Sequence, residues 1–301
     1  MVHPSDLIVA DIPHYSFAEQ IRLPSIIRSA HADLFLGLHF NIPFFCPVPF
    51  VATIHDLILH RYPNTSSVLK KMLYRMQMRH AVRRSVAVLT VSDFVSTEIA
   101  KTYGEDLHSK MTVIYEGIDE CFFPRGEREQ EQVLKKYHLT KPYFLYVGNA
   151  KPHKNVPLLI EAFSRMWDSS RELVLLSGGK EIERLSPLPA GVRRLAGVPI
   201  ADLPALYSAA LSFVTLSTYE GFCLPVAEAL ACGCPVIAAD RGPIPEIARG
   251  HALLVEPELA AVIAALNHPP LRREPFLFGT WKQPAQRACG VLRAVLGKSA
   301  T

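Results

Sequence analysis

The second half of this chain alternates short apolar runs with segments of helical periodicity, and this alternation constrains the fold more than any other feature. Strands separated by helices are typical of parallel sheets built from βαβ units. The expected strands are Tyr143–Val147, Leu173–Leu176, Val192–Leu195, Leu211–Leu216, Pro235–Ala239 and Leu253–Val255. The helices expected between them include Val156–Trp167, Leu203–Ala210 and Pro225–Cys232. The sequence therefore predicts a Rossmann-like domain here.

The first half carries a less complete form of the same pattern. Strands are expected at Phe50–Ile54, Val86–Val91 and Thr112–Tyr115, around a helix at Val68–Arg84. A chain of 301 residues suits two domains of about 150 residues each. We expect the linker in the charged stretch Phe123–Gln132, an N-terminal Rossmann-like domain over residues 1–130, and a C-terminal one over residues 131–301. The N-terminal domain is expected to be incomplete, because no Gly-rich turn follows an opening strand near Met1.

Composition excludes several other classes of protein. A formal charge of +4, without dense Lys/Arg interleaved with aromatics, argues against a nucleic-acid-binding protein. Six cysteines without a signal peptide favour reduced thiols in a cytoplasmic protein, and Cys232 and Cys234 have no second pair at a zinc-like spacing. The uncharged run from Leu34 to Ile54 is long enough for a bilayer, but its three prolines favour buried strands and a loop.

The strongest chemical signal is a segment with two glutamates eight positions apart. It follows the strand Leu211–Leu216 and reads Glu220-Gly221-Phe222-Cys223-Leu224-Pro225-Val226-Ala227-Glu228. Proline suits the first position of a helix, so the preceding backbone N–H groups are expected to form an anion site there. Glu228 is then expected in the first turn, where it could accept ribose hydroxyls, with Glu220 facing the sugar. An isolated glutamate pair is more often a helix-dipole partner and a solvated loop residue.

A second element follows the first predicted strand of this half. It reads Gly148-Asn149-Ala150-Lys151-Pro152-His153-Lys154-Asn155 and precedes the helix Val156–Trp167. Ligands of open α/β sheets bind outside the carboxyl ends of the strands, where Lys154 could neutralise a diphosphate leaving group. A lone lysine in such a loop is most often only solvated.

Together these residues resemble family 4 of the retaining glycosyltransferases, which has the GT-B architecture of two Rossmann-like domains facing a cleft. The resemblance runs through most of the chain, and its marks are Thr53-Ile54-His55-Asp56-Leu57, Val91-Ser92-Asp93-Phe94, Gly117-Ile118-Asp119, Gly148 through Asn155, Gly197-Val198, Glu220 through Glu228, Ala231-Cys232-Gly233-Cys234-Pro235-Val236 and Pro245-Glu246. It implies a donor bound by the C-terminal domain and an acceptor bound by the N-terminal one.

The resemblance also implies roles for individual residues. Lys154 matches the phosphate-binding lysine, Glu228 the ribose carboxylate, Glu220 the carboxylate near the transferred sugar, and His55 the cleft histidine. The expected catalytic residues are therefore His55, Glu220 and Lys154. The expected donor-binding residues are Gly148, Asn149, Lys154, Gly197, Val198, Glu220, Gly221, Phe222, Cys223, Leu224 and Glu228. By itself, a histidine after a strand is about as often structural as functional.

The predicted function is transfer of a hexosyl residue, with mannosyl as the first guess, from a GDP- or UDP-linked sugar to a glycan or lipid-linked acceptor with retention. No Asp-x-Asp pair occurs, so no metal or other cofactor is expected. The alternative is a non-catalytic nucleotide-sugar-binding protein with a degenerate acceptor domain.

Two departures from the family pattern lie in the C-terminal half. His153 stands where an arginine commonly precedes the phosphate lysine, which predicts weaker or pH-sensitive diphosphate binding. The stretch from Glu256 to Trp281 is abbreviated, ahead of a last helix expected at about 281–297 that packs back toward the N-terminal domain.

A basic stripe marks the helix Val68–Arg84. Lys71, Arg75, Arg79 and Arg83 recur every four residues and flank an apolar face of Leu69, Met72, Leu73 and Met76. This pattern allows peripheral contact with anionic lipid at the cytosolic membrane face, although a solvated helix face is the commoner explanation.

Overall fold

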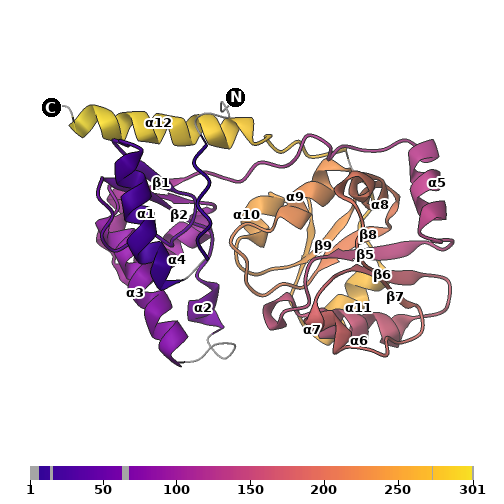
Figure 1. Cartoon of the computed structure of the whole chain (residues 1–301). Coiled ribbons are helices and arrows are strands. Elements are labelled where there is room, and N and C mark those ends of the chain that lie inside the picture. Colours follow the sequence, from indigo (N-terminus) through magenta and orange to yellow (C-terminus); the bar gives the residue numbers. More distant parts are fainter. Residues whose placement is uncertain (1–6, 14–15, 63–67, 273, 300–301) are drawn as a thin grey trace. The chain divides into compact units, whose positions relative to one another are not determined.

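The computed structural model describes residues 7–13, 16–62, 68–272 and 274–299. The chain forms two compact units, shown in Figure 1 with colours that follow the sequence. The first unit comprises Met1–Ile114 with Gln286–Thr301, and the second comprises Tyr115–Ala285. In this division the N-terminal segment of the first unit ends at Ile114. From the sequence, the first domain is expected to end at residue 130.

The second unit is built on a six-stranded sheet in which every strand pair is parallel. Its strands are β5 (Tyr143–Val147), β6 (Glu172–Leu176), β7 (Val192–Leu195), β8 (Ser212–Thr215), β9 (Val236–Ala239) and β10 (Leu253–Val255). They lie in the order β10-β9-β8-β5-β6-β7. Numbered from β5, this is the doubly wound order 6-5-4-1-2-3 of a complete Rossmann fold.

Helices cover both faces of this sheet, which explains why its strands are continuous apolar runs. The helices of this unit include α5 (Glu127–Lys136), α6 (Val156–Met166), α7 (Lys180–Glu183), α8 (Leu203–Ala209), α9 (Leu224–Ala231), α10 (Ile244–Ala248) and α11 (Leu259–Asn267). On one face, α6 and α11 pack together over side chains such as Phe144, Leu173 and Ile237. On the other, Tyr207 of α8 packs edge-on against Phe213 of β8.

The stretch Phe123–Gln132, expected to be a linker, contains the start of α5 and lies inside the second unit. The helix begins with Glu127 and Glu129 and ends with Lys135 and Lys136, so its charges complement the helix dipole. None of its residues is buried, which is why its sequence resembles a charged connection.

The first unit holds a parallel four-stranded sheet in the order β1-β2-β3-β4. Its strands are β1 (Phe35–Gly37), β2 (Phe50–Ile54), β3 (Ala87–Thr90) and β4 (Met111–Val113). Its helices are α1 (Phe17–Ser29), α2 (Ile58–Arg61), α3 (Val68–Arg84), α4 (Asp93–Tyr103) and the 3-10 helix η3 (Glu105–Lys110). The run Leu34–Ile54 is thus two strands and a loop, as its prolines indicated.

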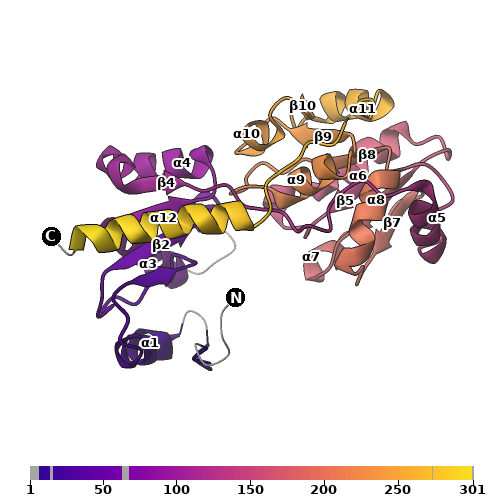
Figure 2. The ribbon, with the colours of Figure 1, turned by 90° about the horizontal axis from the view of Figure 1, so that it is seen from above.

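The last helix, α12 (Lys282–Ser299), packs on the sheet of the first unit. Its partly buried Ala288, Val291, Leu292 and Val295 cover Val51, Ala87, Leu89 and Ile114. Figure 2 shows this helix, in yellow, lying across the strands of that unit. Upstream of it, Ile118 forms a parallel bridge with Thr280, and its N–H donates to the Gly279 carbonyl at 3.2 Å.

Across residues 7–13, 16–62, 68–272 and 274–299, no helix combines the length and apolarity needed to cross a bilayer.

Candidate functional site

The chain of the second unit changes direction at the middle of its sheet, between β5 and β8. From β5 it proceeds to β6 on one side, and from β8 to β9 on the other. Such a switch point leaves a crevice outside the carboxyl ends of the two strands, because their following loops diverge. Lys154 follows β5 and Glu220 follows β8, so the topology alone brings these two side chains to one place.

Lys154 and Glu220 form a direct ion pair at this point, between Nζ and Oε1. Their side chains retain only 17% and 13% of their exposure. A largely buried charge pair costs desolvation energy that its own attraction repays only partly. The pair therefore places a cation and a carboxylate outside the carboxyl ends of the strands, where ligands of this fold bind.

The loop after β5 is shaped by its glycine and its asparagine. Gly148 has φ +147°, which side-chain-bearing residues rarely adopt, and a Cβ there would lie 3.1 Å from the Tyr146 hydroxyl. That hydroxyl donates to the Asn149 carbonyl at 2.6 Å, and the Asn149 side chain accepts from the Lys151 N–H at 3.1 Å. These bonds fix the backbone that leads into the 3-10 turn η4 (Pro152–Lys154).

His153 ties the two loops of the site together. Its carbonyl accepts from the Thr218 N–H at 2.8 Å and from the Thr218 and Ser217 hydroxyls at 3.1 and 3.3 Å. Burial, with the charges of Lys154 and Lys151, lowers the pKa of its imidazole to about 4. His153 is therefore neutral near pH 7 and adds no second positive charge beside Lys154.

The segment before α9 turns sharply into the helix. Phe222 is buried, with its ring centroid 6.2 Å from that of Tyr115, and Cys223 has φ +80°. A non-glycine residue in this conformation is uncommon, and such strain clusters at functional sites. Leu224 is the first helical residue, one position earlier than expected, so Pro225 takes the second position. The positive end of the helix dipole lies at this turn.

Glu228 consequently lies in the second turn of α9, not the first as expected. It is a half-buried carboxylate inside the helix rather than a helix-end one. Burial raises its pKa from 4.5 to about 7; the Tyr207 hydroxyl, which donates to its Oε2 at 3.1 Å, lowers that pKa, and the charge of Asp119 raises it. Tyr207 itself is completely buried. Spacing along the sequence pointed to neither Tyr207 nor Asp119 as a neighbour of this carboxylate.

The pKa of the Cys223 thiol shows which charged side chains lie near it. Burial raises the pKa of Cys223 well above its usual value, and the charges of Glu220 and Glu228 raise it further while Lys154 lowers it. All three charges are therefore within electrostatic reach of a single side chain. The second unit thus places Lys154, Glu220 and Glu228 around the turn before α9.

Two family profiles match almost the whole chain. "Glycosyl transferases group 1" matches residues 127–274, and "Glycosyltransferase Family 4" matches residues 3–121. The chain belongs to glycosyltransferase family 4.

Curated relatives of this family 4 chain include two O-antigen enzymes. O-antigen chain mannosyltransferase B of Escherichia coli is 32% identical over 71% of this chain and 59% of its own length. O-antigen chain mannosyltransferase RfbU of Salmonella typhimurium is 31% identical over 81% of this chain and 66% of its own length. The chain thus spans about six tenths to two thirds of these relatives.

Solved structures confirm the GT-B fold. Sucrose-phosphate synthase from Thermosynechococcus elongatus superposes with a TM-score of 0.76 at 20% identity, covering 96% of this chain and 81% of that one. HepE from Anabaena, in complex with UDP and glucose, superposes with a TM-score of 0.68 at 21% identity, covering 85% and 74%. At these identities the likeness concerns the fold alone.

Three further predicted residues of this family 4 chain belong to other elements than the loops of Lys154 and Glu220. Gly197 and Val198 follow β7, two strands away from β5, and Gly197 has φ +67°, with open space where a Cβ would stand. His55 belongs to the first unit, directly after β2. Its Nε2 lies 2.9 Å from the Leu38 carbonyl, and its ring stacks on His39 with centroids 6.4 Å apart.

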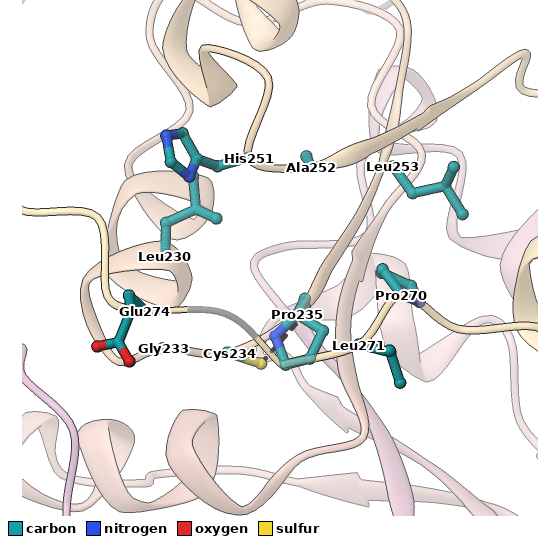
Figure 3. A pocket seen from close by; sticks show the side chains of 10 residues that line it. All are labelled: Leu230, Gly233, Cys234, Pro235, His251, Ala252, Leu253, Pro270, Leu271 and Glu274. Atoms are coloured by element: carbon teal, nitrogen blue, oxygen red, sulfur yellow. Dashed lines mark hydrogen bonds between the residues drawn. The ribbon is translucent and has the colours of Figure 1, made fainter.

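A pocket of about 150 Å³ lies at the opposite edge of the same sheet. Its lining comes from the end of α9, from residues at the starts of β9 and β10, and from Pro270, Leu271 and Glu274, which follow α11 (Figure 3). His251 and Leu230 lie on one side of it, and Pro270 and Leu271 on the other. Because all six strands are parallel, this amino edge is remote from the loops that carry Lys154 and Glu220.

Proposed function

We propose that this chain transfers a hexosyl residue, specifically mannosyl, from a nucleoside-diphosphate sugar to a glycan or lipid-linked acceptor, with retention of configuration and without a metal ion. The observation that carries the proposal is the Lys154–Glu220 ion pair at the sheet switch point, with Glu228 in the same cluster. The names of the mannosyltransferase relatives support the choice of sugar. We propose that the protein works in the cytoplasm.

The diphosphate of the donor is proposed to lie over the amino end of α9. The backbone of Gly221, Phe222, Cys223 and Leu224 surrounds that end, and the helix dipole favours negative charge there. Lys154 would then supply the positive charge that a metal ion supplies in other diphosphate sites. The backbone of Gly148 and Asn149 forms the facing loop, and Gly197 and Val198 are proposed to border the nucleotide base.

Glu228 is proposed to hold the ribose by accepting hydrogen bonds from its hydroxyls. An ionised carboxylate is required for this, and the Tyr207 hydroxyl stabilises the ionised form. Such hydrogen bonds to a charged group contribute about 1.5–3 kcal/mol each. Glu228 is half-buried, so water has limited access to these contacts.

The transfer step breaks the bond between the anomeric carbon and the diphosphate oxygen. A bond to the acceptor hydroxyl oxygen forms on the same face, and the hydroxyl proton passes to the departing diphosphate. Negative charge accumulates on the leaving group, and Lys154 offsets it at the moment it develops. Glu220, already paired with Lys154, is proposed to face the sugar, and His55 is the proposed catalytic residue contributed by the first unit.

The test is a transfer assay with labelled donors. The protein is incubated with GDP-mannose, UDP-glucose and other nucleotide sugars, each with lipid-linked and free glycan acceptors, and the anomeric configuration of the product is determined by NMR. Transfer from at least one donor with retention is expected. Tight donor binding without transfer to any acceptor would instead support a non-catalytic nucleotide-sugar-binding protein.

A further inference from the structure

The solvent side of helix α3 in the first unit carries several apolar side chains. Its side chains Val68, Leu69, Met72, Leu73 and Met76 are between 48% and 81% exposed. The helix buries a different set against its own unit, namely Tyr74, Gln77, Met78, Ala81 and Val82. A surface helix usually turns polar residues toward solvent, and an exposed apolar cluster is typical of an interaction surface.

The exposed apolar surface continues beyond the helix onto a neighbouring loop. Phe45 is 85% exposed and Phe44 is 36% exposed in the segment between β1 and β2. This segment is fixed to α3 by His80, whose ring lies 4.9 Å from that of Phe44 and whose Nε2 lies 3.1 Å from the Pro43 carbonyl. His80 is one helical turn beyond Met76, so Phe44 adjoins the same side of the helix, and the exposed Phe45 follows it in the chain. We call these seven apolar residues the α3 face.

Positive charge surrounds the α3 face. Residues 57–92 contain seven Lys or Arg and no Asp or Glu. Arg75, Arg79 and Arg83 recur at four-residue spacing on the exposed side, and Lys70 and Lys71 lie near the start of the helix. The acids that reach this segment come from other elements, since Glu98 of α4 pairs with Arg61 and Asp106 of η3 pairs with Arg83.

We propose that the α3 face docks on the surface of a bilayer that contains anionic lipid. Apolar side chains in the middle of a basic rim fit such a surface, because methionine, leucine and phenylalanine enter the acyl boundary while lysine and arginine reach the phosphates. A second copy of the chain is a poor occupant, since two identical basic rims would repel each other. The helix would lie in the plane of the interface.

This docking needs no nucleotide sugar and is independent of the proposed transfer activity. The full chain is mixed with phosphatidylcholine vesicles, with or without phosphatidylglycerol, and bound protein is measured by flotation. Binding is expected only to the vesicles with phosphatidylglycerol, and it is expected to fall steeply when salt is raised, because each cation near an anionic surface contributes to affinity. Equal binding to both vesicle types, or binding unaffected by salt, would overturn the proposal.

Variants test the basic side chains and the apolar side chains of this surface separately. Arg75→Glu with Arg79→Glu should weaken binding to phosphatidylglycerol vesicles about tenfold or more, and Met72→Glu with Leu73→Glu should also weaken it. The matched control is Arg128→Glu with Lys135→Glu on the exposed α5 of the second unit, which makes the same charge change away from the α3 face. All the altered side chains are largely exposed, so the substitutions should leave the fold intact. The salt dependence is measured on the wild-type chain and therefore does not depend on any variant folding. Loss of binding in the control alone would refute the assignment.

The alternative occupant of the α3 face is a second copy of the chain. It is tested by measuring the mass of the wild-type chain in solution by light scattering. A monomer in the absence of vesicles is expected. A dimer that Met72→Glu with Leu73→Glu converts to a monomer would show that the α3 face pairs two copies of the chain, and the lipid proposal would be wrong.

Discussion

The six-stranded sheet of the second unit has a carboxyl edge, where its parallel strands end, and an amino edge, where they begin. Charged side chains gather at the first, and a pocket lies at the second. The carboxyl edge gathers Lys154, Glu220 and Glu228, largely withdrawn from water, around the strained turn before α9. The amino edge has a well-formed pocket of about 150 Å³ lined mainly by apolar groups such as Leu230, Pro235 and Leu271. Withdrawing charge from water is costly, so its concentration at one edge marks the functional edge better than a hollow does.

The amino edge also contains a largely buried ion pair, so burial of charge does not by itself distinguish the two edges. Glu172, at the start of β6, is as little exposed as Glu220 and pairs with Arg193 at 3.3 Å. Its pair braces a strand end, because Arg193 also donates to the carbonyls of Tyr137 and His138. Burial and pairing alone therefore do not define the site; position at the switch point does. The following experiments test the assignment of the site to the carboxyl edge.

The largest effect is expected from removing the groups that hold the donor. Lys154→Ala and Glu228→Ala should each lower kcat/KM by about 10²-fold or more, because each removes a charge-assisted contact. The control is Lys136→Ala, which breaks the exposed Lys136–Asp202 pair at 2.6 Å in the same unit and should leave the rate nearly unchanged. Near-normal rates for both site variants would reject the assignment of the carboxyl edge.

A smaller effect is expected from Glu220→Gln, which keeps the size of the side chain and removes its charge. Because Glu220 is proposed to face the sugar, kcat should fall about tenfold, while the dissociation constant of the nucleoside diphosphate should change little. Glu172→Gln is the matched variant at the amino edge. If Glu172→Gln reduced kcat as much as Glu220→Gln, the distinction between the two edges would be lost.

Tyr207→Phe should move the pH dependence rather than abolish activity. The Tyr207 hydrogen bond lowers the pKa of Glu228, so its loss should raise that pKa above about 7 and move the acidic limb of kcat/KM toward higher pH. A hydrogen bond of about 1.5 kcal/mol corresponds to roughly one pH unit. The other titratable groups that interact with this carboxyl are Asp119, Cys121, Cys223 and Cys232.

Tyr143→Phe serves as the control for this pH experiment. Tyr143 is equally buried, and its hydroxyl donates to the Leu206 carbonyl at 2.7 Å, so the substitution removes a buried hydroxyl without touching Glu228. Its acidic limb should stay in place. An identical shift in both variants would show that the pH effect reports general loosening of α8.

The smallest effect is expected from removing divalent metal. If Lys154 and the amino end of α9 supply the positive charge for the diphosphate, excess EDTA should change the transfer rate by no more than about twofold. The measurement is the initial rate before and after chelation, with MgCl₂ added back. A large loss restored by MgCl₂ would mean that the carboxyl edge is incomplete without a cation.

Local patterns in the sequence predicted the scaffold of this site well. The strands β2, β5, β7 and β10 and the helix α3 match their predicted bounds, because apolar runs and helical periodicity are local signals. The predicted start of α9 was one residue late. Proline tolerates either of the first two helical positions, so the sequence pattern alone could not show that Glu228 lies one residue deeper, in the second turn.

Neighbours made by tertiary packing could not be read from spacing. Tyr207 reaches Glu228 from a different helix, and His153 joins two loops through its backbone carbonyl rather than its ring. Helix α5 was mistaken for a linker because it buries no side chain and therefore shows no apolar face. The family resemblance supplied the roles of the residues; the packing around them came only from the fold.

The most direct test of the central claim is a crystal structure of the protein with a bound nucleoside diphosphate. We predict that the diphosphate lies within hydrogen-bonding distance of Lys154 Nζ, over the amino end of α9, and that the ribose hydroxyls donate to Glu228. A nucleotide bound instead in the pocket beside Leu230 and His251, or one that contacts Lys154 but leaves Glu228 unengaged, would contradict the account.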